Sequence, residues 1–135
     1  MSGLRETTPL PATDMLLPTQ RYAAGLVRSH ELAVPLGATR ACCVVDRRDP
    51  SFQAYAQTDL VALLSLELSL DSGTTWSSAG GCGMNGGVHR RQDATLATMS
   101  SLTVPLPAPD QPQRRLRVAM ELLRPVTLDC RVEVR

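Results

Sequence analysis

The chain has 135 residues and a net charge of +1 at neutral pH, with 43% apolar and 20% charged residues. A chain of this length typically forms one domain that buries roughly two-thirds of its unfolded surface, so no disulfide or metal is required for a core. A charge this close to zero gives no whole-protein field toward nucleic acid or an anionic membrane. We therefore expect a soluble single-domain protein with neither nucleic acid nor membrane as partner.

The four cysteines, Cys42, Cys43, Cys82 and Cys130, form no C-x-x-C or zinc pattern. Cys42 and Cys43 are neighbours on a predicted strand and point to opposite faces, so they cannot share one metal. We expect buried free thiols, with no metal and no cofactor. The first twenty residues lack the continuous apolar segment of a signal peptide, and no stretch approaches the ~20 apolar residues of a membrane span. Synthesis in a reducing compartment is therefore expected.

The N-terminal segment, residues 1–20, contains three prolines separated by threonines. Proline removes backbone donors and favours extended chain, so we predict an extended arm outside a β-domain of residues 21–135. A disordered terminus is the alternative. The functional hypothesis is an arm that becomes ordered against a neighbouring subunit, with Met15, Leu16 and Leu17 as its apolar contacts.

Alternation of apolar residues predicts strands along most of the remaining chain. The clearest case runs from Leu60 to Leu70, where leucine or alanine occupies every second position. A helix is the alternative because Leu, Ala and Glu favour helices, but the period of two fits better and a turn follows directly. The first half of this run is apolar on both faces, which predicts that both faces are covered there.

Other strands are predicted from shorter patterns. Residues 22–34 indicate one bent strand or two short ones, 40–45 a buried strand, and 95–104 another strand before a proline-rich connection. Residues 116–122 and 126–134 alternate cleanly and are interpreted as a hairpin with one buried and one solvated face. Arg114, Arg115 and Arg117 are assigned to solvent. The total of seven or eight strands predicts an all-β antiparallel sandwich or jelly roll.

One motif follows the clearest strand. Ser69, Asp71, Gly73, Thr75 and Trp76 occupy every fixed position of the Asp-box pattern, S-x-D-x-G-x-T-W. Asp71 can accept hydrogen bonds from turn N–H groups, and Gly73 can take a positive φ. The motif resembles the box that recurs in each blade of sialidases and related propellers, where it is structural, but this chain has one copy and is too short for a propeller. The pattern therefore predicts a hairpin turn, with carbohydrate binding as a secondary hypothesis.

A glycine-rich stretch follows Trp76. Its Gly81, Gly83 and Gly86 match the dinucleotide-binding spacing, but no helix follows and no acid lies at the required distance, so this function is rejected. The glycines are assigned to a hairpin or a closely packed loop. Asn85-Gly86 predicts a type I′ turn.

An exposed basic loop containing His89, Arg90 and Arg91 comes next. No G-x-S-x-G nucleophile elbow is present, and no acid or nucleophile is placed beside His89 by the sequence. We therefore predict no catalytic residues and a protein that is not an enzyme, with a hydrolase using His89 as the remaining alternative. Phosphate binding by this loop is a minor option.

From Leu64 to Arg135 the layout resembles small all-β structural proteins of tailed bacteriophages, and size and composition are similar to those of jelly-roll cement proteins. The resemblance implies a capsid decoration protein without enzymatic activity, made in the host cytoplasm and carried in the virion. It implies binding to the major capsid protein or other virion proteins, and a homo-oligomer. The contact candidates are Met15, Leu16, Leu17, Tyr22, Asn85, His89, Arg90 and Arg91.

Two further functions remain open from the sequence. A phage tail or head–tail adaptor protein would use the same contact residues. A small carbohydrate-binding module is suggested by the Asp box and Trp76, but the chain has few aromatic residues to form a sugar platform.

Overall fold

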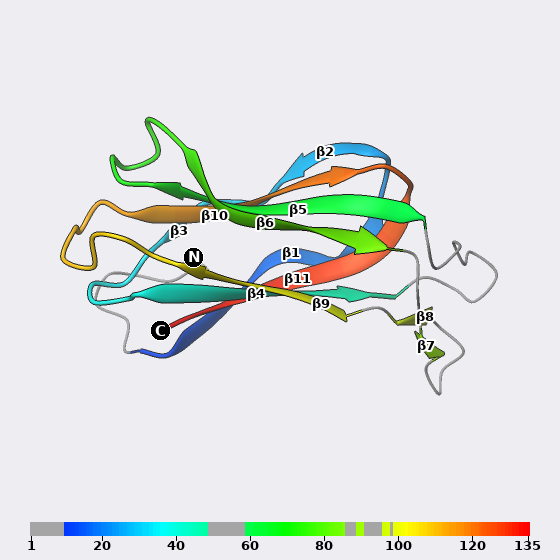
Figure 1. Cartoon of the computed structure of the whole chain (residues 1–135), viewed down its shortest axis with the longest axis horizontal. Helices are drawn as coiled ribbons and strands as arrows, with labels where there is room; N and C mark the ends of the chain where they lie inside the picture. Colours follow the sequence, from blue (N-terminus) through cyan, green and yellow to red (C-terminus); the bar gives the residue numbers. More distant parts are fainter. Residues whose placement is uncertain (1–9, 49–58, 86–88, 91–95, 98) are drawn as a thin grey trace.

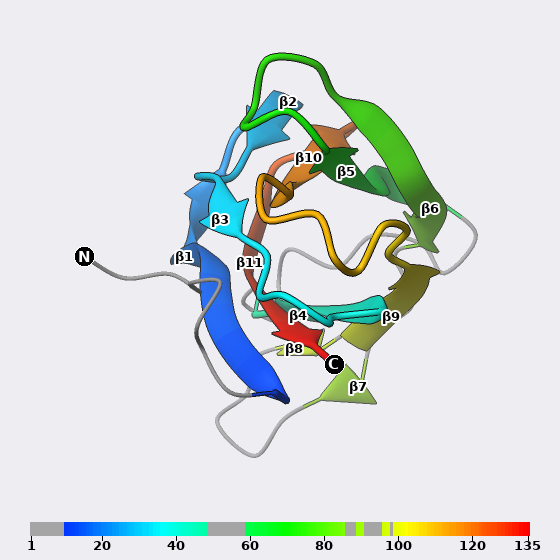
Figure 2. The same ribbon diagram turned by 90° about the vertical axis from the view of Figure 1, so that its left-hand side faces the viewer.

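The computed structural model describes residues 10–48, 59–85, 89–90, 96–97 and 99–135, and these parts are all-β with no helix. Two antiparallel sheets pack face to face (Figures 1 and 2). Sheet A has the order β1 (Ala12–Tyr22), β11 (Val126–Val134), β4 (Arg40–Arg47), β9 (Met99–Pro105). Sheet B has the order β2 (Gly25–Arg28), β10 (Arg115–Leu122), β5 (Leu60–Ser69), β6 (Ser77–Asn85), and β3 (Leu32–Ala33) also pairs with β10. A separate ribbon pairs β7 (His89–Arg90) with β8 (Leu96–Ala97).

The strand pairing is nested. The first strand β1 pairs with the last strand β11, β2 and β3 pair with β10, β4 pairs with β9, and β5 pairs with β6. This is the pattern of one long hairpin folded over on itself, which is the topology of a jelly roll. The prediction of an all-β sandwich of jelly-roll type is confirmed.

The core lies between the two sheets and follows the period of two. Leu64, Leu66 and Leu68 of β5 are buried, and so are Val118 and Met120 of β10. Each fully buried side chain of this kind stabilises the fold by about 1.5–3 kcal/mol. The strand interpretation of residues 60–70 is therefore correct. The helix alternative fails because a helix would not bring every second leucine to the same face.

The N-terminal segment differs from its predicted role. Residues 12–22 form β1, which pairs with β11 along its length, so the sandwich begins before residue 21. Leu16 and Leu17 are buried in the core, and Tyr22 is buried with its hydroxyl donating to the Pro18 carbonyl at 2.7 Å. Proline is compatible with this strand because β1 is the edge of sheet A, where one side needs no donors. Residues 1–9 lie outside the described part.

The C-terminal strands also differ from prediction. β10 and β11 were expected to pair as a hairpin, but β10 lies in sheet B and β11 in sheet A. The chain crosses between the sheets at Arg124-Pro125 instead. The inward faces were predicted correctly, because alternation fixes which side chains are buried, whereas the pairing partner depends on contacts distant in sequence.

The shorter elements agree with the sequence. Residues 22–34 form the two short strands β2 and β3, and residues 40–45 lie within β4. The predicted strand at 95–104 appears as β8 and β9. The sequence also predicts a loop at residues 51–58, which lie outside the described part of the chain.

The glycines of β6 allow a close approach of this strand to the core. A Cβ added at Gly80 would lie 2.6 Å from Cγ1 of Val104 on the facing sheet, and one at Gly81 would lie 2.9 Å from the Leu64 carbonyl oxygen. At Gly83 the nearest atom, 3.0 Å away, is the end of the flexible Leu60 side chain. Of the two predicted assignments the hairpin is correct, because Gly80, Gly81 and Gly83 lie in a strand of the β5–β6 hairpin and not in a loop.

One end of the sandwich is organised by a buried cation. Arg114, assigned above to solvent, is only 1% exposed. Its guanidinium donates to the carbonyl oxygens of Ala38 and Pro35, at 2.7 and 3.0 Å, and to those of Pro107 and Pro109, both at 3.3 Å. These carbonyls belong to the β3–β4 and β9–β10 loops, which run over the same end of the molecule (Figure 1). Burial lowers the pKa of Arg114 from its ordinary value.

We predict that Arg114→Ala lowers the free energy of unfolding by at least about 2 kcal/mol, because several buried carbonyls lose their donors. Arg114→Lys should rescue only part of this loss, since an ammonium cannot span four acceptors as a planar fork does. Urea unfolding followed by circular dichroism gives the comparison. The adjacent Arg115→Ala is the matched control, and equal midpoints for both alanine variants would contradict the role of Arg114.

The glycine contacts in β6 predict that three Gly→Ala substitutions lower the free energy of unfolding by different amounts. Gly81→Ala should destabilise most, by about 1–3 kcal/mol, because its new methyl group meets backbone that cannot rotate away. Gly80→Ala should also destabilise, and Gly83→Ala should have little effect. Thermal unfolding of the three variants measures the order, and an equal loss at all three positions would show that generic strand propensity dominates.

Candidate functional site

The Asp-box turn between β5 and β6 has the geometry that the motif predicts. Ser69 Oγ accepts from the Gly73 N–H at 2.8 Å and donates to Asp71 Oδ1 at 2.7 Å. Asp71 Oδ1 also accepts from the Thr75 N–H at 2.9 Å, and Oδ2 accepts from the Thr75 hydroxyl at 2.6 Å. Gly73 has a φ of +91°, which L side chains rarely adopt. The indole of Trp76 folds back and donates to the Gly73 carbonyl at 3.1 Å.

These hydrogen bonds favour the charged form of the Asp71 carboxyl. The hydrogen bonds from the Thr75 side chain and backbone, with that from Ser69, lower the pKa of Asp71 from 3.8 to about 2. A carboxylate that accepts several donors is stabilised in its charged form. The turn is thus satisfied internally, and this local structure accounts for the whole motif.

Trp76 does not offer a free platform to a ligand. The guanidinium of Arg117 lies 4.0 Å from the centre of the Trp76 ring, in a cation–π contact. Arg117 also donates to Glu67 at 2.7 Å across the β10–β5 pair, and Arg28 lies 3.9 Å from the same carboxylate. One face of the indole is therefore covered by a side chain that is itself held in place, which removes the main support for a sugar-stacking site.

The outer face of sheet B carries exposed leucines beyond this network. Leu26 is 57% exposed, Leu63 43% and Leu60 39%. Leu26 and Leu63 both flank Glu121 on β10, and Leu60 and Leu63 both lie against Gly83. A small hollow of about 190 Å³ lies among Leu26, Leu63, Ser65, Ala119 and Glu121. We call the surface formed by Leu26, Leu60, Leu63 and Ala119 the sheet B patch.

The sequence had predicted that both faces of β5 are covered at this end. The inner face is covered by the core, but within the described residues the outer side chains of Leu60 and Leu63 remain partly exposed. Both leucines share this face because Val61 is an extra residue in the β5–β6 register between Leu60 and Ala62. A group of exposed leucines on one face is typical of a protein-interaction site, and here Glu121 lies between Leu26 and Leu63.

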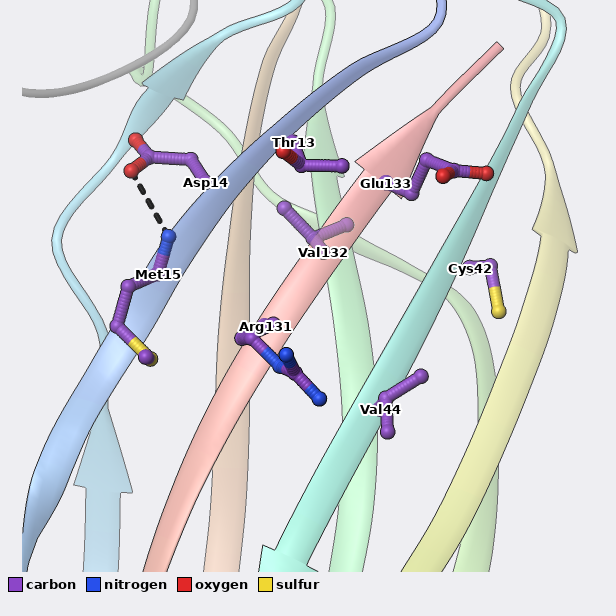
Figure 3. A pocket seen from close by; sticks show the side chains of 8 residues that line it. All are labelled: Thr13, Asp14, Met15, Cys42, Val44, Arg131, Val132 and Glu133. Atoms are coloured by element: carbon purple, nitrogen blue, oxygen red, sulfur yellow. Dashed lines mark hydrogen bonds between the residues drawn. The ribbon is translucent and has the colours of Figure 1, made fainter.

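A second depression lies on the outer face of sheet A. It encloses about 620 Å³ among Thr13, Asp14, Met15, Cys42, Val44, Arg131, Val132 and Glu133 (Figure 3). Arg131 lies between Met15 and Val44 across the sheet, and Glu133 lies between Thr13 and Cys42. The groove is open and mixes apolar, cationic and anionic side chains, so charged groups lie among its apolar ones. It can bind polar groups, but it contains no pair of residues arranged as nucleophile and base.

The predicted contact residues are dispersed. Met15 is 41% exposed in the sheet A groove, whereas Leu16, Leu17 and Tyr22 are buried in the chain's own core. Replacing the leucines with serine would therefore damage the fold, and an intact fold cannot be expected from such variants. Asn85 is exposed at the end of β6, and His89 and Arg90 form β7. Arg91 lies outside the described residues.

The cysteines are placed for packing. Cys43 and Cys130 are buried on neighbouring strands with their sulfur atoms 3.1 Å apart. The hydrogen bond with Cys43, followed by burial, raises the pKa of Cys130, which disfavours a reactive thiolate. Cys42 and Cys82 are half-buried free thiols. In the described part of the chain, no group of three or more His, Cys, Asp or Glu residues is placed to hold a metal ion.

Comparison with protein-family models gives no match, and comparison with curated protein sequences gives none. Solved structures do show similarity. The VP2 subviral particle of infectious bursal disease virus has a TM-score of 0.54 at 6% identity, over 96% of this chain and 33% of that chain. The K1 cleaved adhesin domain of Lys-gingipain from Porphyromonas gingivalis W83 has a TM-score of 0.49 at 14% identity, over 82% and 62%. TmCBM61, solved with β-1,4-galactotriose, has a TM-score of 0.41 at 12% identity, over 90% and 63%.

At these identities the similarities show the fold alone. Viral capsid proteins and carbohydrate-binding modules occur among these proteins, and this chain spans less than two-thirds of each of the three. No helix among the described residues is long and apolar enough to cross a membrane. The chain is thus a β-sandwich module, and its candidate interaction surface is the sheet B patch.

The lowered pKa of Asp71 predicts a specific pH dependence. A depressed folded-state pKa gives stability that is present above the unfolded value of 3.8 and is lost as pH falls toward about 2. Asp71→Asn should remove this part of the acid dependence, and Thr75→Val should raise the pKa of Asp71. Carboxyl ¹³C shifts measured by NMR follow the titration directly. An unchanged pKa in Thr75→Val would contradict the assigned cause.

Proposed function

We propose that this protein is a non-enzymatic virion structural protein that binds neighbouring capsid subunits as a decoration, or cement, protein. The observation that carries the proposal is the sheet B patch, where exposed leucines gather on a sheet face. The jelly-roll fold supports the proposal, since this architecture is widely used in viral capsids. The resemblance of residues 64–135 to phage structural proteins points in the same direction.

The patch suits a protein partner better than a small ligand. Its hollow is shallow and small, whereas small-molecule sites usually enclose about 300–1,000 Å³. Glu121 lies between Leu26 and Leu63, and Arg28 and Glu67 lie further along the same outer face, so the patch combines apolar and charged groups as protein interfaces do. A tail or head–tail adaptor protein would use the same chemistry, and its position on the particle would distinguish it.

Density-gradient sedimentation tests whether this is a virion structural protein. A lysate of the cells that produce the protein is fractionated, and the protein is followed by mass spectrometry. Co-migration with virus-sized particles is expected, and the copy number per major capsid protein separates decoration from tail assembly. Recovery only as a free small species would overturn the proposal, and glycan binding would then be the next assay.

The surface assignment gives a second prediction. The double variant Leu26→Ser, Leu63→Ser should lower occupancy on particles at least about tenfold, because the exposed leucines lose burial in the interface. Its own stability should change by less than about 1 kcal/mol, as both residues are solvent-exposed. Leu36→Ser, an equally exposed leucine in the β3–β4 loop, is the matched control. Equal occupancy for both variants would exclude the sheet B patch.

A further inference from the structure

The side of the sandwich formed by β6 and β9 is unlike the rest of the surface. β6 reads SSAGGCGMN and β9 reads MSSLTVP, so neither strand contains a charged residue, although 20% of the chain is charged. Both strands end their sheets, and within the described residues neither has a second strand partner in its sheet. An edge strand without charges is open to pairing with another chain.

The other two sheet edges carry features that hinder pairing with another chain. β1 contains Pro18 and Asp14 and has two register irregularities against β11. The opposite edge of sheet B is divided between the short strands β2 and β3. Proline, charge, bulges and short length all hinder strand addition. Of the two uncharged edges, β9 ends in Pro105, whereas β6 is longer and contains no proline.

The β6 edge has few features that would select a foreign strand. Partners that add a strand are distinguished through pockets for alternate side chains. The outer face of β6 instead carries Gly81 and Gly83, both exposed and without side chains. A second copy of β6 needs no such pockets, because a two-fold axis makes the strand its own complement, and an uncharged strand has no like charges to oppose across the axis.

We propose that two copies of this chain dimerise by antiparallel pairing of β6 with β6, which joins the two B sheets into one continuous sheet. The pairing involves residues 80–84, where β6 is regular against β5; Ala79 is an extra residue opposite the Leu66–Glu67 step. The two-fold axis therefore lies near Cys82. This proposal does not depend on the virion role, although the interface adjoins the sheet B patch, because Gly83 lies against Leu60 and Leu63.

The proposal is tested by placing a charged side chain on the β6 edge. Gly83 is exposed and has ordinary backbone, and a side chain there meets the flexible ends of Leu60 and Leu63, so Gly83→Lys is compatible with the fold. It places two like charges close together near the axis. Sedimentation velocity over a concentration series should show a dimer of the wild type and at least a tenfold higher dissociation constant for the variant. Thr13→Lys, exposed on the distant β1 edge, is the control and should dimerise normally.

Hydrogen exchange provides an independent readout. In the wild type, amides of residues 80–84 should exchange more slowly as concentration rises, and this dependence should vanish in Gly83→Lys. If that variant does not fold, the concentration dependence of exchange at residues 80–84 of the wild type decides the question. A wild-type protein that stays monomeric up to about 1 mM would overturn the proposal. So would a dimer in which neither substitution nor concentration affects the β6 edge.

Discussion

The buried guanidinium of Arg114 is the interaction on which one end of the sandwich depends. The loops that it joins contain Pro35, Pro107 and Pro109, and proline supplies a carbonyl acceptor but no N–H donor. The two loops pair directly where the Gly37 N–H donates to the Pro109 carbonyl at 2.7 Å, but their prolines leave them short of further donors. The planar guanidinium of Arg114 supplies several donors at once, and it reaches carbonyl oxygens of both loops. The cost of burying the charge is offset by these charge-assisted bonds.

The same end also holds the Asp-box turn in place. The Ser72 N–H donates to the Gln113 carbonyl at 3.0 Å, next to Arg114, and Arg117 stacks on Trp76 three residues further along β10. The motif therefore serves as a connection between the β5–β6 turn and β10. This explains why a sequence pattern associated with sugar-processing propellers appears here without a sugar platform. Its polar groups are satisfied within the turn, and its aromatic ring is used for packing.

Local features were predictable from the sequence, and long-range ones were not. The strand Leu60–Ser69 and the turn containing Asp71 depend on spacing within about ten residues, and both were predicted correctly. The segment that contains Leu16 and Leu17 was predicted to be an arm because of its prolines. Only its pairing with β11, over a hundred residues away in the sequence, shows that it is a core strand. Arg114 looked solvated for the same reason, since two of its acceptors, the carbonyls of Pro35 and Ala38, lie in a loop distant in sequence. The sheet B patch needed the register irregularity at Val61, which no periodic pattern indicates.

Close packing in β6 and the openness of its edge have one cause. Because Gly80 and Gly81 approach Val104 and the Leu64 carbonyl so closely, neither position accepts a Cβ without displacement of its neighbours. A charged side chain, the usual protection of an edge strand, is therefore excluded by the core at Gly80 and by the backbone of β5 at Gly81. Strand β6, which covers this side of the core, has no charged side chain along its edge. Gly83 is the one of the three glycines where a charged side chain would fit sterically, and the chain has none there, which leaves the edge open to pairing in the same sheet as the exposed leucines.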